Sequence, residues 1–249
     1  MECIQNGVHV LMEKPLASTV PQAKELSESA RAHGVILQVG HVERFNPTVG
    51  ELEKVLANQR ILSVEVRRLS PYVERAADVS AVLDLMVHDL DLLLSLVNAE
   101  VVTTQAVGIK AKVRCLDHVS AYMLFSNGVI ANLTASKISQ QKIREITVIC
   151  DDKVVQADLL ARTVVVHREA TSDYRAEDSR VLYRQEGIVE QVYVPLVEPL
   201  YAEISHFLTC IRTGEQPLVG GPEATKVLEL AETIERAATH ALAEQRILP

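Results

Sequence analysis

The stretch from Val79 to Val97 constrains the fold most, because it is apolar on almost every side of a helix. A helix of that kind must be covered by other elements. Asp84, His88 and Asp91 interrupt the run, which argues against a membrane span. With 48% hydrophobic residues in 249, the chain has enough apolar material to surround such a helix. We therefore expect a buried helix inside a globular protein.

Two short apolar runs precede this helix and are typical of buried parallel strands: Val8 to Met12 and Val35 to Val39. A helix is predicted between them, with Thr19 as its cap and Gly34 as its left-handed stop. A strand, a helix and a strand in this order indicate the last part of a doubly wound domain.

From Ile61 to Leu69 apolar and polar residues alternate, as in a strand with one buried face. Further strand candidates follow the buried helix: Val101–Gly108, Val119–Phe125, Val129–Ser136, Ile143–Cys150, Val154–Leu159 and Thr163–Arg168. Asn127-Gly128 and Asp151-Asp152 lie between such runs and are hairpin signals. We predict an open, mainly antiparallel sheet with helices on one face.

The remaining segments complete a two-part organisation. Ala170 to Gly187 is polar and is predicted to be a loop, whereas Pro199 to Arg212 and Pro222 to Ala243 are predicted closing helices. The fold class is thus α/β plus α+β. Residues 1–60 would be the end of a doubly wound domain, and residues 61–249 an α+β domain.

The net charge and the cysteine content limit the classes of partner and the cell compartment that we expect. A net charge of −8 argues against binding to nucleic acid or to an anionic membrane, both of which favour basic surfaces. The four cysteines are scattered without a Cys-x-x-Cys pair, so we expect reduced thiols in a cytoplasmic protein. An open sheet face would suit a homo-oligomer.

Asp84, His88 and Asp91 fall on one face of the predicted helix. A polar stripe on a buried helix is either satisfied by hydrogen bonds in the core or faces a cavity. A metal ion would need third and fourth ligands that the sequence does not supply convincingly, so we expect none. In the catalytic interpretation His88 exchanges a proton near neutral pH and Asp84 orients it.

Two further groups of polar residues follow the predicted parallel strands. Lys14 ends the first strand, next to Pro15, and His41, Arg44 and Asn46 come directly after the second. Ligands of doubly wound sheets bind beyond the carboxyl ends of the strands. These residues, together with Glu43 of the second group, would therefore line one crevice, although a polar loop with a proline turn explains the second group equally well.

Together these motifs resemble the Gfo/Idh/MocA family of nicotinamide-dependent sugar and inositol oxidoreductases. The resemblance rests on four segments in the family's order: Glu13-Lys14-Pro15, Gly40-His-x-x-Arg-Phe-Asn-Pro47, Asp84-x-x-x-His88-Asp89-x-Asp91, and Glu203-x-x-x-Phe207 with Gly214-x-x-Pro217. It runs over nearly the whole chain, from residue 1 to about residue 235. It implies that residues 1–60 are a truncated, doubly wound NAD(P)-binding domain and residues 61–249 a domain for substrate binding and oligomerisation.

The resemblance implies that Lys14 and His88 contact the reacting sugar hydroxyl, with Asp84 beside them. It also implies that Glu13, Lys14 and Pro15 approach the nicotinamide ribose of NAD or NADP. The form of the segment around Arg44 and Asn46 is most similar to members that oxidise the 3-hydroxyl of UDP-N-acetylhexosamines. Arg44, Asn46 and Asp91 are accordingly the expected substrate-binding residues.

The chain departs from the family in one respect. Members begin with a strand and a glycine-rich turn that holds the pyrophosphate, and no Gly-x-Gly-x-x-Gly occurs here. We expect about 80 to 90 residues of that design to be absent, judged by the usual place of the lysine motif. The competing hypothesis is a non-catalytic, truncated module that binds a sugar nucleotide or pairs through its sheet.

Overall fold

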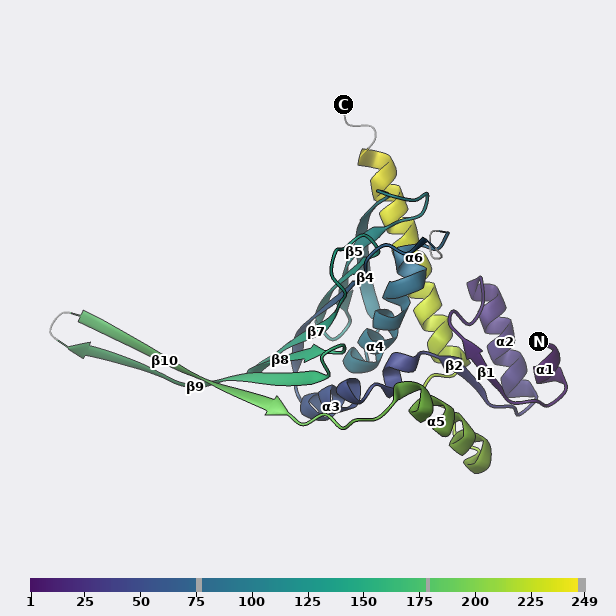
Figure 1. The fold of residues 1–249 in the computed structure, drawn as a ribbon, viewed down its shortest axis with the longest axis horizontal. Helices are drawn as coiled ribbons and strands as arrows, with labels where there is room; N and C mark the ends of the chain where they lie inside the picture. The colour runs from purple at the N-terminus through teal and green to yellow at the C-terminus, as the bar shows by residue number, and fades with distance from the viewer. Residues whose placement is uncertain (75–77, 178–179, 246–249) are drawn as a thin grey trace.

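The computed structural model describes residues 1–74, 78–177 and 180–245. Its first part is a small parallel sheet in which β1 (Val10–Glu13) pairs with β2 (Leu37–Gly40). Two helices accompany these strands, α1 (Glu2–Gln5) and α2 (Val20–Ala32). The predicted order of strand, helix and strand is thus confirmed (Figure 1).

The start of α2 differs from the prediction. Thr19 occupies the cap position, but its side chain accepts no hydrogen bond from the helix. The Val20 N–H donates instead to the Glu232 carboxylate of a distant helix, at 3.3 Å. A tertiary contact therefore replaces the predicted local cap. The predicted stop is confirmed, because Gly34 has a left-handed φ of +64°.

The second part is an eight-stranded sheet in the order β10-β9-β8-β7-β3-β6-β5-β4. Its strands are β3 (Ile61–Leu69), β4 (Val101–Ile109), β5 (His118–Phe125), β6 (Ile130–Ser136), β7 (Ile143–Cys150), β8 (Lys153–Asp158), β9 (Thr163–Glu177) and β10 (Arg180–Val192). β3 and β6 run parallel, and the other neighbouring strands are antiparallel. The predicted mainly antiparallel sheet is confirmed.

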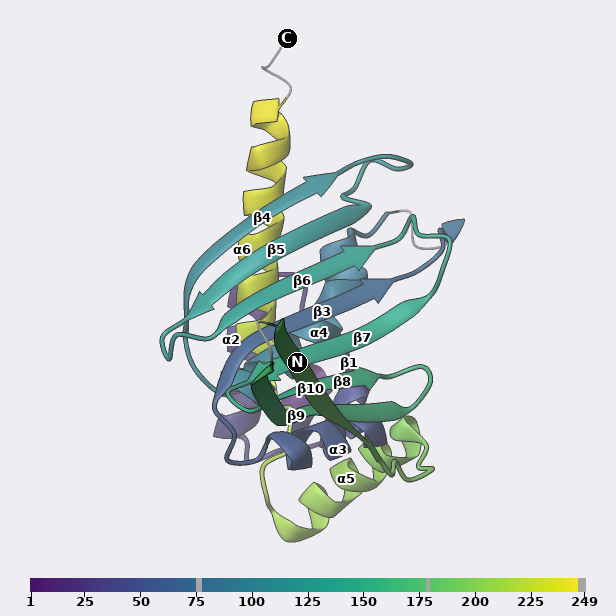
Figure 2. The same cartoon turned by 90° about the vertical axis from the view of Figure 1, so that its left-hand side faces the viewer.

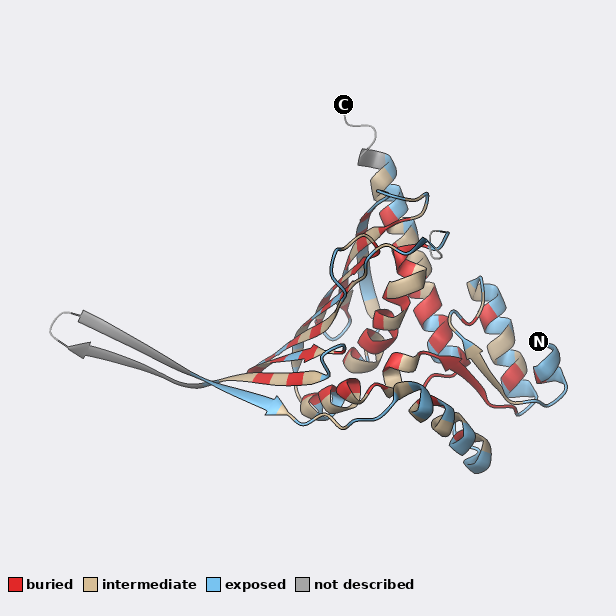
Figure 3. Ribbon diagram, in the orientation of Figure 1, coloured by how far each residue is buried: buried red, intermediate tan, exposed pale blue. Residues whose placement is uncertain are grey.

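Helices cover one face of this sheet and leave the other open (Figure 2). Those that pack on the sheet are α3 (Pro47–Leu56), the π-helical segment η3 (Val82–Met86), α4 (Val87–Val97) and α6 (Gly221–Gln245). The 3-10 helix η1 (Val42–Phe45) packs against α3 and α4, and α5 (Pro199–Thr213) packs against η1. The buried residues lie mainly where α4 and α6 face the sheet (Figure 3). Side chains such as Leu90, Phe125 and Ile146 are at most 1% exposed, and burial of each contributes about 1.5–3 kcal/mol.

The segment from Ala170 to Gly187 was predicted to be a loop, and that prediction is wrong. Its described residues belong to β9 and β10, which pair from Val164↔Val192 to Glu177↔Arg180. The two strands form a long ribbon that projects from the rest of the molecule (Figure 1). Polar composition suggested a loop, but the ladder of backbone hydrogen bonds does not depend on side-chain polarity.

The two parts share their cores. The smaller core of β1, β2 and α2 includes Val219, Ala224 and Leu228 from the end of the chain, so α6 packs against both parts. The boundary near residue 60 remains a prediction, since the first part is completed by residues from the second. Within the described residues, no helix combines the length and the apolar character that crossing a membrane requires.

The close approach of α6 to α2 gives a test of this packing. A Cβ on Gly221 would lie 2.5 Å from Ser27 Oγ and 3.0 Å from Ser27 Cα. We expect Gly221→Ala to lower the free energy of unfolding by about 1–3 kcal/mol, because the helices must separate. Gly50→Ala is the matched control, since nothing lies within 4 Å of its added Cβ. It should stabilise α3 by about 0.5–1 kcal/mol. Equal melting temperatures for the two variants would contradict the packing.

Candidate active site

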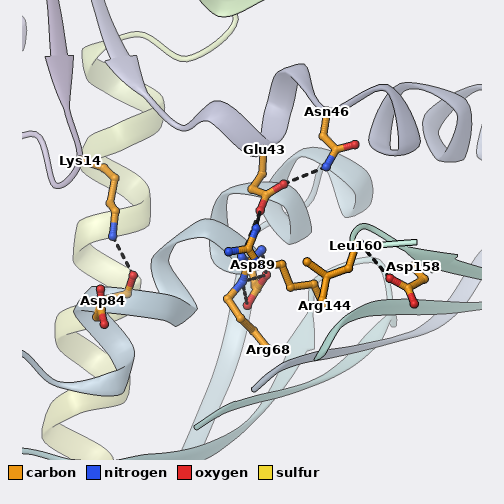
Figure 4. Close-up of polar contacts among 9 residues, drawn as sticks. All are labelled: Lys14, Glu43, Asn46, Arg68, Asp84, Asp89, Arg144, Asp158 and Leu160. Atoms are coloured by element: carbon orange, nitrogen blue, oxygen red, sulfur yellow. Dashed lines mark hydrogen bonds and ion pairs between the residues drawn. The ribbon is translucent and has the colours of Figure 1, made fainter. Parts of the chain in front are cut away.

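Lys14 leaves the carboxyl end of β1, and the peptide bond to Pro15 is cis. Its half-buried ammonium donates a 2.7 Å hydrogen bond to the backbone oxygen of Asp84, seventy residues along the chain (Figure 4). Burial lowers the pKa of Lys14, Arg68 lowers it further, and Asp84 and Glu13 act to raise it. The lysine therefore joins the first part of the molecule to the start of the buried helix.

That start is a π-helical turn, which changes the predicted polar stripe. One extra residue in a π turn rotates the downstream helical residues by about 100° relative to an unbroken α-helix. Asp84 lies in the π turn and His88 in α4, so the spacing expected for an unbroken α-helix does not apply between them. Within the described residues His88 Nδ1 has no hydrogen-bond partner, and the contact of Asp84 with Lys14 uses its backbone oxygen. The arrangement thus gives no sign of the predicted orientation of His88 by the Asp84 carboxylate.

Two imidazoles lie beside Lys14. The rings of His41 and His88 meet edge to face with centroids 6.3 Å apart. Neither Nδ1 has a partner among the described residues, and both atoms are buried. Burial, with Lys14 as the second cause, lowers the pKa of His41 to about 4 and that of His88 to about 2. Both rings are therefore neutral at physiological pH.

A buried network of charges lies next to these rings. Arg68 of β3 is 2% exposed, and its guanidinium binds both oxygens of Asp89 at 2.8 and 3.0 Å. The same guanidinium lies 3.1 Å from Glu43, which also accepts a 2.9 Å bond from Arg144 (Figure 4). Although burial acts to raise the pKa of Glu43, its partners Arg68, Asn46 and Arg144 bring it below the ordinary value. The network joins η1, the sheet and α4.

The residues predicted to bind substrate have different surroundings. Arg44 donates to Asp91 at 3.4 Å, and the second oxygen of that buried carboxyl has no partner among the described residues. Burial raises the pKa of Asp91 to about 7. Asn46 accepts from the Thr48 N–H to cap α3 and donates to Glu43. Both polar ends of Asn46 are thus engaged within the protein, whereas Asp91 keeps a free acceptor.

Sequence reasoning missed Arg68 as a site residue, and it placed His41 in the crevice without giving it a role. The signal for Arg68 is its register, because Val64, Val66 and Arg68 all point to the buried face of β3. An arginine at such a position requires buried carboxylates. The burial of His41, at 2% exposure, has no comparable signal, since a polar loop sequence follows β2 directly.

The end of β1 is the part that fits a nicotinamide cofactor. Glu13 is exposed beside Lys14, and its Oε2 would lie 3.2 Å from a Cβ on Gly40, so the two strand ends are in close contact. Glu13 and Lys14 offer polar groups at this strand end, whereas the sequence contains no glycine-rich turn of the kind that holds a pyrophosphate. No group of potential metal ligands occurs within the described ranges.

Two open hollows of about 810 and 670 Å³ border α6, and neither is lined by Lys14, His41 or His88. The first lies among α2, the start of β2 and the start of α6, and the second between α4, β4 and α6. We place the chemistry at Lys14 because cationic and neutral polar groups converge there, which volume alone does not report.

Comparison with known proteins identifies the family. Residues 1–41 match the oxidoreductase family with an NAD-binding Rossmann fold, and residues 48–156 match the GFO/IDH/MocA C-terminal domain. UDP-N-acetylglucosamine 3-dehydrogenase of Acidithiobacillus ferrooxidans is 32% identical over 230 residues, which cover 92% of this chain and 70% of that protein. The chain belongs to the Gfo/Idh/MocA family of oxidoreductases. Among other relatives, scyllo-inositol 2-dehydrogenase (NAD(+)) of Bacillus subtilis is 24% identical over 92% of the chain and 68% of its own length.

Solved structures agree with this assignment. The chain superposes on the A. ferrooxidans enzyme with a TM-score of 0.87 and 29% identity, covering 97% of this chain and 74% of that one. The WlbA dehydrogenase from Bordetella pertussis, in complex with NADH and UDP-GlcNAcA, has a TM-score of 0.73 at 21% identity, and here the likeness concerns the fold alone. The family therefore comprises oxidoreductases that include sugar and inositol dehydrogenases.

The buried network can be tested by removing its centre. Arg68→Met leaves Glu43 and Asp89 buried without their main cation, so we expect a loss of about 3–5 kcal/mol in unfolding free energy. Arg67→Met is the matched control. Arg67 is the residue before Arg68 on β3, its side chain is 45% exposed, and it pairs with the Glu145 side chain, which is 43% exposed. Its loss should cost less than about 1 kcal/mol. Similar denaturant midpoints for both variants would show that the network does not stabilise the fold.

Proposed function

We propose that this protein oxidises a secondary hydroxyl of a sugar, with NAD or NADP as the hydride acceptor. The observation that carries the proposal is the position of the Lys14 ammonium. Lys14 follows the end of the parallel strand β1, and its ammonium donates a hydrogen bond to the Asp84 carbonyl. It also lies close enough to His41 and His88 to lower the pKa of both rings. Such a cation stabilises an alkoxide without a metal.

Alcohol oxidation removes a hydride from carbon and a proton from oxygen. Bound NAD(P)+ supplies the hydride acceptor. The chain supplies the rest through the Lys14–His88 pair: the unprotonated Lys14 amine takes the hydroxyl proton, and the ammonium that forms stabilises the oxygen, while His88 holds the hydroxyl through its acceptor nitrogen. A neutral His88 presents an acceptor nitrogen to the hydroxyl, and the lowered pKa of Lys14 brings that amine closer to proton exchange at neutral pH. We assign Asp84 a supporting position, since its backbone oxygen holds Lys14.

We take a UDP-N-acetylhexosamine as the substrate, by likeness to the A. ferrooxidans enzyme. Arg44 and Asp91 are the proposed polar contacts to it, because Asp91 retains an acceptor without a partner among the described residues. Asn46 would act indirectly, by holding Glu43 and the start of α3. Glu13, Lys14 and Pro15 would adjoin the nicotinamide ribose. The four cysteines are free thiols, which is consistent with a cytoplasmic location.

We also propose that the open face of the sheet joins two copies of the chain. Outward-facing side chains on this face include Val107, Tyr122 and Ile149, which are 52%, 39% and 43% exposed. Apolar residues spread over neighbouring strands at that exposure are typical of a surface that is covered in an assembly. The other candidate function is a non-catalytic module that binds a sugar nucleotide or pairs through its sheet, and such pairing would use the same open face.

Turnover tests the proposed chemistry. Nicotinamide reduction is followed with NAD+ and NADP+ against UDP-N-acetylglucosamine, UDP-glucose and inositols. We expect Lys14→Met and His88→Phe each to lower kcat by about 10²–10⁴-fold with unchanged melting temperature, because each removes a contact made in the transition state. Lys54→Met, at an exposed lysine of α3, should retain full activity.

Two results would contradict the dehydrogenase assignment for this chain. One is dissociation of NAD(P) at millimolar concentration or weaker together with tight binding of the sugar nucleotide, which would favour the non-catalytic module. The other is turnover that survives loss of Lys14.

Sedimentation velocity tests the sheet surface. We expect Val107→Glu combined with Tyr122→Glu to convert the oligomer to monomers, since two charges would be buried without partners in the interface. Leu160→Glu serves as the control, because Leu160 is 40% exposed in the turn after β8 and lies outside this face. A wild-type chain that sediments as a monomer at micromolar concentration would exclude the assembly.

A further inference from the structure

His41 is held in a fixed place directly after β2. Its N–H donates to the Val39 oxygen at 2.8 Å, and its own oxygen accepts from the Arg44 N–H at 3.0 Å. The residue is 2% exposed. Backbone contacts on both sides therefore fix where the ring can point, and burial limits its rotamers.

The ring has one polar atom that the described residues do not satisfy. His41 Nδ1 is buried without a partner among them, and a buried polar atom in that state costs about 1–3 kcal/mol. The nearby cations make their hydrogen bonds to groups other than His41, since Lys14 donates to the Asp84 oxygen and Arg44 to Asp91. An apolar ring would fill the same space without this cost. A function outside the folded chain is the simplest reason for an imidazole here.

We propose that His41 is a second substrate-contacting imidazole, which binds the oxygen on a carbon adjacent to the one that is oxidised. The inference rests on the proposed function for the site, and it adds a requirement for two neighbouring oxygens on the sugar or polyol ring. His88 and Lys14 hold the reacting hydroxyl, and His41 holds its neighbour.

The geometry of the two rings supports this division. With centroids 6.3 Å apart and an edge-to-face arrangement, the rings do not hydrogen-bond to each other. Oxygens on adjacent ring carbons are near enough to each other to reach both imidazoles at ordinary hydrogen-bond lengths of about 2.7–3.2 Å. A neutral imidazole also offers one donor and one acceptor, which suits an uncharged hydroxyl or an acetamido group.

The charges around the site keep the His41 ring neutral. Burial is the main cause of the lowered pKa of His41, and Lys14 and Arg44 lower it further. A protonated ring would only donate, and it would repel the Lys14 ammonium. The neutral ring can instead accept from a hydroxyl or donate to it, and its state does not change across physiological pH.

The test compares His41→Phe with His41→Gln. Phenylalanine keeps an aromatic ring but no polar nitrogen, whereas glutamine restores a donor and an acceptor. We expect His41→Phe to lower kcat/KM about 10-fold or more, mainly through KM, with partial rescue by His41→Gln. His33→Phe, which changes an exposed histidine of the same unit, should leave kcat/KM unchanged.

Monodeoxy analogues of the substrate give the decisive comparison. The wild type should lose at least about 10-fold in kcat/KM on the analogue that lacks the neighbouring hydroxyl, and His41→Phe should lose nothing further on that analogue alone. A variant that discriminates against every analogue as the wild type does would overturn the proposal, because a structural role predicts that result.

A binding measurement separates this proposal from the proposed function. Two-bond proton–nitrogen NMR spectra of the imidazoles are recorded while UDP-N-acetylglucosamine or scyllo-inositol is added to the full chain. Movement of the His41 nitrogen resonances, at constant protonation state, supports the contact even if no turnover occurs. If His88 responds to a ligand and His41 does not, or if neither ring responds to either ligand at millimolar concentration, the contact is refuted.

Discussion

The pairing of Arg68 with Asp89 and Glu43 is the interaction on which the rest of the site depends. A guanidinium at 2% exposure is stable only with its carboxylates in place, and these come from α4 and η1. Because Asp89 follows His88 and Glu43 follows His41 by two residues, one arginine fixes the positions of both imidazoles. The inward register of Arg68 on β3 thus determines where His41 and His88 lie in the crevice.

The same network determines the electrostatics of the crevice. Glu43 and Asp89 offset the charge of Arg68, whereas Lys14 has the Asp84 backbone oxygen as its close partner. An ammonium held by a neutral dipole retains its charge for a ligand, and it favours neutral forms of nearby rings. A site that combines the Lys14 ammonium with the neutral rings of His41 and His88 suits an oxygen that becomes negative during the reaction.

The sequence predicted the parallel pair, the mainly antiparallel sheet, and the position of Lys14 at a strand end, because each depends on local periodicity and strand polarity. It failed where nonlocal contacts decide. Thr19 forms no side-chain cap because the Val20 N–H donates to Glu232, and residues 170–177 pair with 180–187 as strands although their composition is polar. The π turn is also invisible in the apolar pattern. Arg68 was missed, although its inward register on β3 could have revealed it.

The π turn also explains how the two parts of the molecule produce one site. Leu83, within the turn, packs against both hydrophobic cores, and the adjacent Asp84 carbonyl receives the Lys14 ammonium. A second link runs from the Gln38 amide to the Glu203 oxygen of α5. Docking of the first part on α6 and α5 therefore positions Lys14 relative to His88. Mutations far from the crevice, at the contact between α2 and α6, would consequently reduce turnover by displacing one side of the site from the other.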